Sequence, residues 1–349
     1  MYKEAIQDAI STNELPSEWS SALLSEAEHV AQKKKTAKYR KDLRKLPFVT
    51  IDGEDAKDFD DAIYCVKNTS GYRLYVAIAD VSFYVEANSK LDKEAKKRGT
   101  SIYFPETVIP MLPENLSNGI CSLRPNEDRC SMICEMSIDL DGTRKKYKFY
   151  SGLINSKARL TYNQVEKHFK KSSSIKQSIV RESIKHLFDL TNVRLKLRNQ
   201  RRALEINPTE AILELNKNKE VNNIVIKKNL FAHKLVEESM LLANESAAEF
   251  MHDRLDLGVY RIHEDPDPSK LETLKKHFKV PAQIAKKSSP LEVINSCLKE
   301  AHENKDDTGQ ILVLQTLARA EYSTTNLGHF GLQLKQYSHF TSPIRRYPD

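Results

Sequence analysis

Four aspartates that lie close together in the sequence could hold a metal ion for hydrolytic chemistry. They belong to the stretch TIDGEDAKDFDDAI, directly after the apolar, strand-like run 48–51, and are Asp52, Asp58, Asp60 and Asp61. Carboxylates about 5 Å apart repel each other by roughly 3 kcal/mol per pair where the effective dielectric constant is near 20. A half-buried cluster therefore needs cations, and an all-oxygen ligand set favours Mg²⁺, or Mn²⁺, over zinc.

The acidic stretch alone leaves other interpretations open. An acidic loop by itself is more often a solvated turn than a metal site. A calcium loop of the EF-hand type beginning at Asp52 would need Gly at its sixth and Glu at its twelfth position, where the chain has Lys57 and Ile63. A phosphatase that forms an aspartyl-phosphate would place Thr soon after its acids, whereas the run DFD continues into DAI. The EF-hand is excluded and the phosphatase is weakened.

Longer blocks of sequence resemble one enzyme family. The stretch LPFVTIDGEDAKDFDDAIYC resembles the signature of the RNB family, the catalytic domain of ribonuclease II and ribonuclease R. Further similar blocks follow in the family's order: YVAIADVSFYV (75–85), RGTSIYFPETVIPMLPENLSNGICSLRPNEDR (98–129), ARLTYNQV (158–165), LVEESMLLAN (235–244), YRIHEDPDP (260–268) and HFGLQLKQYSHFTSPIRRYPD at the end. The chain is therefore identified as a member of this family, with blocks closer to the ribonuclease R branch.

The resemblance implies a metal-dependent 3′-to-5′ exoribonuclease. Family members degrade single-stranded RNA processively by hydrolysis and release nucleoside 5′-monophosphates. The chemistry of the acidic residues agrees, because a pair of metal ions lowers the pKa of an attacking water and neutralises the departing 3′ oxygen. No side-chain nucleophile is then required.

The resemblance also implies roles for individual residues of the acidic stretch and of the C-terminal block. Asp52, Asp58 and Asp61 match positions that coordinate metal directly or through water, and Asp60 matches the acid whose loss is most damaging to catalysis. Arg345 matches the arginine that contacts the scissile phosphate, where a guanidinium fork can donate two hydrogen bonds to an anion. Without the family match, an Arg-Arg pair is more often a surface charge pair.

Three further residues match positions that contact RNA. Tyr103 matches an aromatic residue that packs on the terminal nucleotide, and Tyr162 one that lies near stacked bases farther up the channel. Glu238, rather than Glu237, matches a glutamate that is paired with the Tyr162 position against a base. Taken alone, the tyrosines would be ordinary half-buried packing, and Glu238 an exposed acid on the helix predicted over 229–257 by its apolar spacing.

The order of predicted elements indicates an α+β fold with the RNB architecture, in which a strand-rich N-terminal half packs against a helix-rich C-terminal half. Residues 1–46 are expected to form a helical lead-in with a basic linker, and 47–349 the catalytic domain. Short strands and turns alternate over 47–160, and helices dominate from about 161 onward, interrupted by a hairpin at 211–226. The active site must then form where the two halves meet.

The amino-acid composition limits the possible functions and locations of the protein. A net charge of +7 fits a protein that binds a polyanion such as single-stranded RNA. Basic runs at 33–45 and 194–202 could each line an RNA entrance or form a solvated helix face. Five cysteines without a CxxC motif indicate neither a zinc site nor a disulfide framework. The sequence shows no membrane-spanning run and no signal peptide, so a cytoplasmic location is expected.

The chain departs from full-length relatives at both ends. The resemblance leads us to expect that the flanking cold-shock and OB-type RNA-binding domains are absent, and that the chain stops before a further helix. The alternative hypothesis is therefore a truncated, non-catalytic RNA-binding or regulatory remnant of such an enzyme. A metal-dependent phosphomonoesterase is a more distant alternative.

Overall fold

The computed structural model describes residues 2–32, 38–105, 107–171, 175–206, 211–216, 220–226, 229–255, 257–280 and 288–349. The first half of the chain is rich in strands: α1 (Tyr2–Thr12), α2 (Ser21–Ala31), β1 (Lys41–Asp42), β2 (Val49–Asp52), β3 (Asp61–Asn68), β4 (Gly71–Ala79), α3 (Val81–Tyr84), α4 (Lys90–Arg98), β5 (Ile102–Phe104), β6 (Thr107–Ile109), a π-helix (Asn115–Ile120), β7 (Asp128–Ile138), β8 (Arg144–Asn155) and β9 (Ala158–Thr161).

The second half is mainly helical, as the sequence predicted: α5 (Tyr162–Lys171), α6 (Ser178–Gln200), β10 (Ala211–Leu215), β11 (Val221–Ile226), α7 (Phe231–Leu255), β12 (Tyr260–Ile262), α8 (Pro268–His277), α10 (Pro290–Glu303), α11 (Asp307–Thr316) and β13 (Glu321–Ser323). The long helix expected over 229–257 is α7, and the hairpin expected at 211–226 is β10–β11. The α+β fold class is confirmed.

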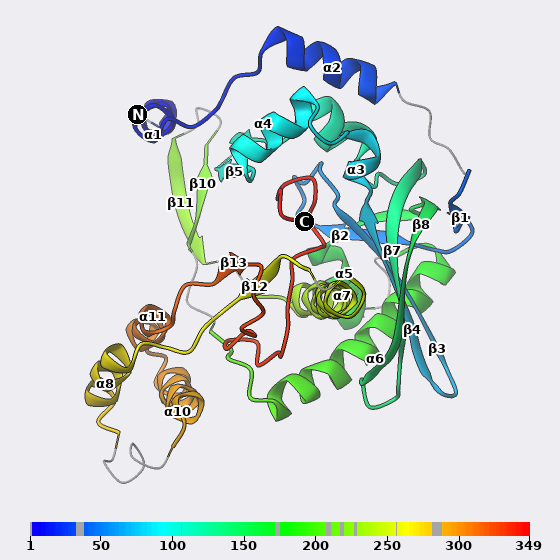
Figure 1. Cartoon of the computed structure of the whole chain (residues 1–349). Helices are drawn as coiled ribbons and strands as arrows, with labels where there is room; N and C mark the ends of the chain where they lie inside the picture. Colours follow the sequence, from blue (N-terminus) through cyan, green and yellow to red (C-terminus); the bar gives the residue numbers. More distant parts are fainter. Residues whose placement is uncertain are drawn as a thin grey trace.

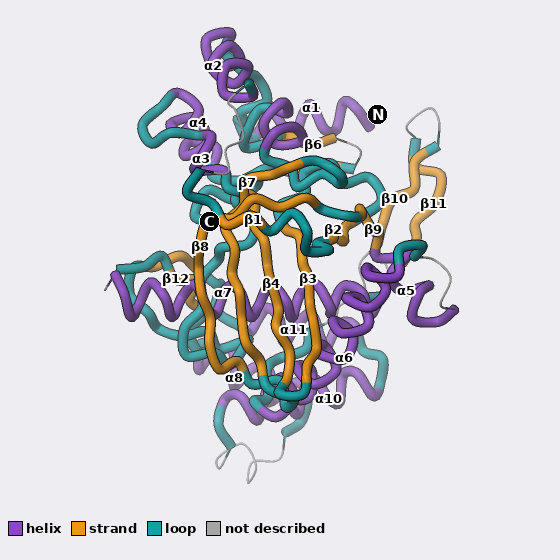
Figure 2. The backbone as a smooth tube through the Cα atoms, turned by 90° about the vertical axis from the view of Figure 1, so that its right-hand side faces the viewer, coloured by secondary structure: helices purple, strands orange, loops and turns teal. Residues whose placement is uncertain are grey.

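A seven-stranded mixed sheet forms the centre of the molecule, in the order β1-β8-β7-β4-β3-β2-β9. Its four long strands are antiparallel neighbours, and β9 joins β2 in parallel at one edge. Figure 2 shows β8, β7, β4 and β3 running side by side. These strands are longer than the short strands predicted, because β7 and β8 pair from Asp128↔Asn155 to Ile138↔Arg144.

Both faces of the sheet are covered, so alternate residues of each strand enter different cores. Ala77 on β4 packs in a cluster with α2 and the π-helix, whereas its neighbours Val76 and Ile78 pack in a second cluster with α6 and α7. Figure 1 shows α7 end-on beside the sheet, with α5 and α6 next to it. Burial on both faces gives the near-continuous apolar run of β4, because neither face can hold exposed polar residues.

The helix α6 also completes the hydrogen bonding of the sheet. The short strand β2 pairs with β3 only at Val49↔Ile63, which leaves backbone groups of β3 without a neighbouring strand. The amide of Cys65 donates instead to the hydroxyl of Ser183 on α6 (3.1 Å). A buried backbone N–H left unpaired costs free energy, so this contact fixes α6 against the strand that begins at Asp61.

Three helices form a separate small core away from the sheet. Leu274 of α8, Ile294 of α10 and Val313 of α11 are fully buried there, and Figure 1 shows the three helices together at one end of the molecule. The pair β12–β13 leads from this group back toward the centre, where the C-terminal segment ends. Of the described helices, none has both the length and the apolarity needed to cross a membrane.

An ion pair buried beside the sheet yields a prediction for stability. Arg40 and Asp80 are 2.7 Å apart, and their side chains are 6% and 8% exposed. Replacing Arg40 with methionine would leave a buried carboxylate without its partner, and we expect the free energy of unfolding to fall by about 3–5 kcal/mol. Chemical denaturation measures this change.

The matched control is Lys299→Met, which removes a lysine from an ion pair with Glu303 in which both side chains are well exposed. Exposed pairs contribute at most about 1 kcal/mol, so the control should unfold almost like the wild type. Equal losses in the two variants would show that Arg40 does not stabilise Asp80.

Candidate active site

The acidic loop is held between two strands of the sheet. Asp52 is the last residue of β2 and Asp61 the first of β3, so the loop 53–60 leaves and re-enters the sheet at the same end. The parallel pair β2–β9 places Thr161 opposite Asp52, and Tyr162 follows directly at the start of α5. Strand pairing thus brings the matched residue Tyr162 to the acidic loop.

Asp60 lies in contact with the C-terminal block. Its side chain is only 3% exposed, and its two oxygens accept from different donors. Oδ1 accepts from the backbone N–H of Ile344 (2.8 Å), and Oδ2 accepts from Nε of Arg345 (3.1 Å). The side chain of Arg345 is 49% exposed. Asp60 holds its Nε, and its Nη2 donates to the hydroxyl of Ser342 (3.3 Å), so among the described contacts Nη1 is the nitrogen left for a ligand.

The segment that carries Arg345 is fastened by backbone bonds to the residues after α4. The carbonyl of Arg345 accepts from the N–H of Ser101 (3.0 Å) and the hydroxyl of Thr100 (2.9 Å), and the N–H of Tyr347 donates to Gly99 (2.9 Å). Gly99 has a φ of 71°, a backbone conformation that favours glycine. The end of α4 therefore determines the position of the arginine.

The long helix α7 anchors the same segment from its other side. The buried amide of Asn244 donates to the hydroxyl of Tyr337 (3.0 Å) and accepts from the backbone N–H of Phe340 (2.8 Å). Because both the NH2 group and the oxygen of this side-chain amide are hydrogen-bonded, Tyr337 and Phe340 are held in one geometry. The C-terminal segment is thus held by α4 and by α7.

Burial raises the pKa of three of the acids, Asp52, Asp60 and Asp61. Burial and the charge of Asp52, opposed by Arg345, raise the pKa of Asp61 to about 7. Burial also raises the pKa of Asp60 well above its usual range, against the effect of Arg345 and of the Ile344 N–H. The pKa of Asp52 is raised in the same way, in part by Asp58. This arrangement favours a cation beside the acids.

Tyr103 joins the site from the β5–β6 hairpin. Its hydroxyl donates to Asp58 (3.1 Å), and its side chain is 51% exposed. Burial of the hydroxyl and the charge of Asp58 raise the pKa of Tyr103, so it is a neutral donor at pH 7. An exposed aromatic ring offers a face on which a nucleotide base can stack.

The structure separates Glu238 from the residue with which the resemblance paired it. The ring of Tyr162 packs on His233, with centroids 4.2 Å apart. Glu238 is buried in ion pairs with Arg194 (3.5 Å) and Arg198 (3.2 Å), and no contact between Glu238 and Tyr162 is found in the described part of the chain.

Its neighbour Glu237 is the accessible acid of the pair. Glu237 is 46% exposed, bonds Arg198 (2.6 Å), and lines a cavity of about 1660 Å³ that includes none of the four aspartates. A ligand that entered this cavity would meet Glu237 before the buried Glu238.

The basic runs predicted to line an RNA entrance are partly used inside the protein. Arg194 and Arg198 bind Glu238 on α7, and Arg202 binds Glu292 on α10 (2.8 Å). Of the first run, Arg40 is buried and Arg44 binds Asp42 and Asp128, while Lys33, Lys34 and Lys35 lie outside the described residues. These pairs cross-link elements far apart in the sequence.

The carboxylates of the acidic loop fit a divalent metal ion by their chemistry, although they do not surround one position. Within the described ranges, no three Asp, Glu, His or Cys side chains converge closely enough to hold a metal ion as they stand. The chemistry of the set nevertheless fits a hard divalent cation, because its ligands are carboxylate oxygens whose pKa values are raised by burial and by one another. Binding an ion would require the carboxylates to turn toward it.

Comparisons with known proteins give the family. The RNB domain model matches residues 40–349. The chain belongs to the RNB family. It is 42% identical to ribonuclease R of Vibrio parahaemolyticus over 98% of this chain and 42% of that protein, and 44% identical to ribonuclease R of Thermotoga maritima over 96% of this chain and 48% of that protein. The resemblance to the ribonuclease R branch is confirmed.

Solved structures agree with the fold. The structure of Mycoplasma genitalium RNase R in complex with ribose-methylated single-stranded RNA matches with a TM-score of 0.92 and 35% identity, over 99% of this chain and 55% of that chain. Yeast Ssd1, described as a pseudonuclease, matches at 20% identity with a TM-score of 0.70 and shares the fold alone. The chain spans about half the length of the ribonuclease R proteins that it matches.

Two residues that shape the acidic loop were not predicted from the sequence. Arg159 on β9 donates to the carbonyl of Gly53 (2.8 Å) and also contacts the carbonyl of Glu54. Ser122, in the loop between the π-helix and β7, binds the backbone on both sides of Asp58. Both lie in blocks that resemble the family, but neither residue type indicates by itself a contact with a distant loop.

Histidines make the segment that carries Arg345 sensitive to acid. Burial and the charge of Arg346 lower the pKa of His339 to about 3, and burial and His263 lower the pKa of His329 to about 4. In the unfolded chain each of these histidines takes up a proton near pH 6.5, whereas in the folded chain both stay neutral at that pH. The stability contributed by the two histidines is therefore fully present above about pH 6.5. It is lost as the pH falls toward their pKa values in the folded chain.

We expect the melting temperature to decrease between about pH 7 and pH 5, and to decrease less in a His339→Asn variant. Thermal unfolding followed by circular dichroism across this range measures both. Parallel pH profiles for the two proteins would show that His339 does not cause the acid sensitivity.

Proposed function

We propose that this chain is the catalytic part of a hydrolytic 3′-to-5′ exoribonuclease that acts on single-stranded RNA and releases nucleoside 5′-monophosphates. The observation that supports this most is the contact between Asp60 and Arg345, which sets a half-exposed guanidinium beside a loop with three further carboxylates. Membership of the RNB family and likeness to ribonuclease R give the reaction class. Processive degradation belongs to the same proposal.

The residues proposed to hold a divalent metal, Mg²⁺ or Mn²⁺, are Asp52, Asp58 and Asp61. Asp60 is the least available ligand, because both of its oxygens already accept hydrogen bonds. When bound, the metal supplies a water of lowered pKa and charge neutralisation at the departing oxygen. Asp60 then acts through Arg345, which it holds in place.

Arg345 and Tyr103 are proposed to hold the 3′-terminal nucleotide. The remaining guanidinium nitrogen, Nη1, can donate to the oxygens of the scissile phosphate, where negative charge develops during hydrolysis. The ring of Tyr103 can stack on the terminal base, since every base offers a π-face and stacking requires no particular sequence. Its hydroxyl bond to Asp58 couples this stacking position to the acidic loop.

Removing the ring of Tyr103 should weaken binding of the RNA 3′ end. Stacking contributes about 1–3 kcal/mol per base, so Tyr103→Ala is expected to raise the dissociation constant of a short oligonucleotide by about 5- to 150-fold, measured by fluorescence anisotropy in Ca²⁺. Tyr103→Phe keeps the ring and should bind nearly as the wild type. Loss of affinity in both variants would assign binding to the hydroxyl and contradict the stacking role.

A 5′-labelled single-stranded RNA incubated with the chain and Mg²⁺ tests the function. We expect the labelled strand to shorten step by step from its 3′ end, and to remain intact in the presence of EDTA. Products separated by chromatography should be nucleoside 5′-monophosphates. Cleavage at internal positions, or release of phosphate from a mononucleotide alone, would contradict the proposal.

The second candidate is a non-catalytic RNA-binding protein with the same fold. The observation in its favour is that the carboxylates do not converge on a metal position within the described residues. An RNA that stays intact while it binds the folded chain would support this candidate over the exoribonuclease. In either case we propose a cytoplasmic location, because the five cysteines are free and buried, as in proteins of a reducing compartment.

A further inference from the structure

We infer that Ser122 is a positioning residue for the metal-binding acids, an inference that rests on the proposed function. Its side chain touches none of the proposed substrate positions. Its hydroxyl instead accepts from the backbone N–H of Phe59 (3.0 Å) and donates to the backbone carbonyl of Lys57 (2.7 Å). These two groups belong to the peptide units on either side of Asp58, so one hydroxyl fixes the backbone of that acid from both directions.

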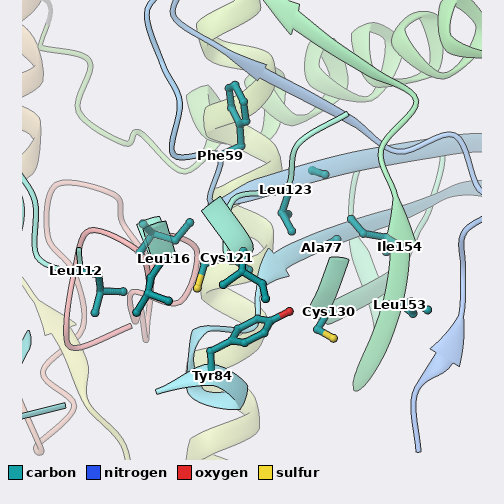
Figure 3. Packing of buried hydrophobic residues seen from close by; sticks show 14 of the residues in the cluster. Phe59, Ala77, Tyr84, Leu112, Leu116, Cys121, Leu123, Cys130, Leu153 and Ile154 are labelled. Carbon is teal, nitrogen blue, oxygen red and sulfur yellow. The ribbon is translucent and has the colours of Figure 1, made fainter. Parts of the chain in front are cut away.

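The backbone of the same segment adds a third bond. The N–H of Leu123 donates to the carbonyl of Phe59 (2.9 Å), directly before Asp60. Phe59 is 7% exposed and belongs to the same buried cluster as Cys121 and Leu123, the two neighbours of Ser122, which Figure 3 labels. Because Phe59 is held in the core, Asp58 and Asp60 on either side of it are confined to a short stretch at the surface of that core.

Ser122 is itself held rigidly. It is 0% exposed, and its carbonyl accepts from Nε of Arg129 on β7 (2.7 Å). The same guanidinium donates to the carbonyls of Asp128 (3.1 Å) and Gly119 (3.2 Å), and its side chain is 3% exposed. A buried arginine with this many backbone partners has one geometry. Arg129 on β7 of the central sheet thus holds Ser122 in place, and Ser122 in turn holds the acidic loop.

This chain of contacts has a consequence for metal binding. The loop 53–60 lies outside the strands, so ladder hydrogen bonds do not fix its inner residues. Side chains that orient ligands through hydrogen bonds typically change metal affinity or activity by about 10- to 100-fold when they are removed. Ser122→Ala leaves the Lys57 carbonyl and the Phe59 N–H without their partner, and Asp58 becomes free to move relative to Asp60.

The test compares Mn²⁺ affinity, measured by electron paramagnetic resonance, with the rate of RNA shortening at increasing Mg²⁺. We expect Ser122→Ala to raise the Mn²⁺ dissociation constant by about 10- to 100-fold and to need correspondingly more Mg²⁺ for half-maximal rate. Ser122→Cys keeps a side chain of similar shape with a weaker donor and acceptor, and should fall between the wild type and Ser122→Ala. If Ser122→Ala does not fold, the Ser122→Cys variant alone tests the inference.

The matched control is Ser131→Ala on β7. The hydroxyl of Ser131 is equally buried and has no hydrogen-bond partner among the described residues, so its removal should leave Mn²⁺ affinity unchanged. If the wild-type chain is active and both Ser122 variants bind Mn²⁺ as tightly as it does, the inference about Ser122 is wrong and the proposed function stands. A folded wild-type chain that neither binds Mn²⁺ nor shortens RNA would overturn the proposed function and the inference with it.

Discussion

Asp60→Asn should abolish RNA shortening while leaving the thermal stability of the chain unchanged or higher. Asparagine keeps the shape of the side chain but has one acceptor oxygen for the two donors that Asp60 serves, Ile344 N–H and Arg345 Nε. Arg345 is then no longer held in place, and the loss of rate is expected to be on the order of 10⁴-fold. Stability should not fall, because burial raises the pKa of Asp60 above its unfolded value, and removing a carboxylate that is costly to ionise offsets the lost hydrogen bond. Ionising such a group costs folding free energy, and stability is lost as the pH rises through the folded pKa.

Gel analysis of 5′-labelled RNA and thermal unfolding at about pH 7 measure the two effects. The matched control is Asp55→Asn, an exposed acid in the same loop that takes no part in the proposed site. It should shorten RNA at close to the wild-type rate. A drop in melting temperature that accompanies the loss of activity in Asp60→Asn would point to a structural role of the carboxylate.

Arg345→Ala is expected to reduce the rate of hydrolysis by about 10²- to 10³-fold, the typical effect of removing one donor to developing charge. Arg345→Lys should recover little of this rate, because an ammonium cannot hold Asp60 through Nε and present a second donor to phosphate. Single-turnover rates at saturating enzyme separate this effect from weaker RNA binding.

Arg346→Gln is the control for Arg345. Arg346 is bonded to Asp349 through two contacts of 2.7 Å and has no proposed contact with RNA. Its replacement should change the single-turnover rate by less than about tenfold. Equal losses in the two arginine variants would mean that the rate depends on the integrity of the C-terminal segment and not on a guanidinium at position 345.

The sequence predicted the parts of the site that are local in the chain. The acidic loop follows an apolar run that does form the buried strand β2. The four carboxylates drew attention to the loop, but by themselves they also fitted a solvated turn, and the resemblance of the surrounding block favoured the metal site. Arg345 could not be found in this way, because an arginine beside another arginine has many ordinary roles. Only the resemblance of its surrounding block pointed to it, and the structure shows it at Asp60.

Interactions between distant residues explain what the sequence did not predict. Glu238, taken alone, looked like an exposed helical acid, but it is buried between two arginines on α6; its contact with RNA stays a prediction. The basic run 194–202 fitted either an RNA entrance or a solvated helix face, and its ion pairs with residues of α7 and α10 could not be foreseen. Ser122 carries no signal at all without knowledge of which backbone groups it meets. Pairing of this kind depends on the packing of whole elements.

The distance along the chain between Asp60 and Arg345 has a consequence for the synthesis of the protein. The two residues are separated by 285 positions, and chains emerge from the ribosome N-terminal end first. The four acids are therefore made long before the arginine that the proposed chemistry requires. The Asp60–Arg345 contact on which the proposed function rests can therefore form only after residue 345 has been synthesised, when almost all of the domain is already available to fold around it.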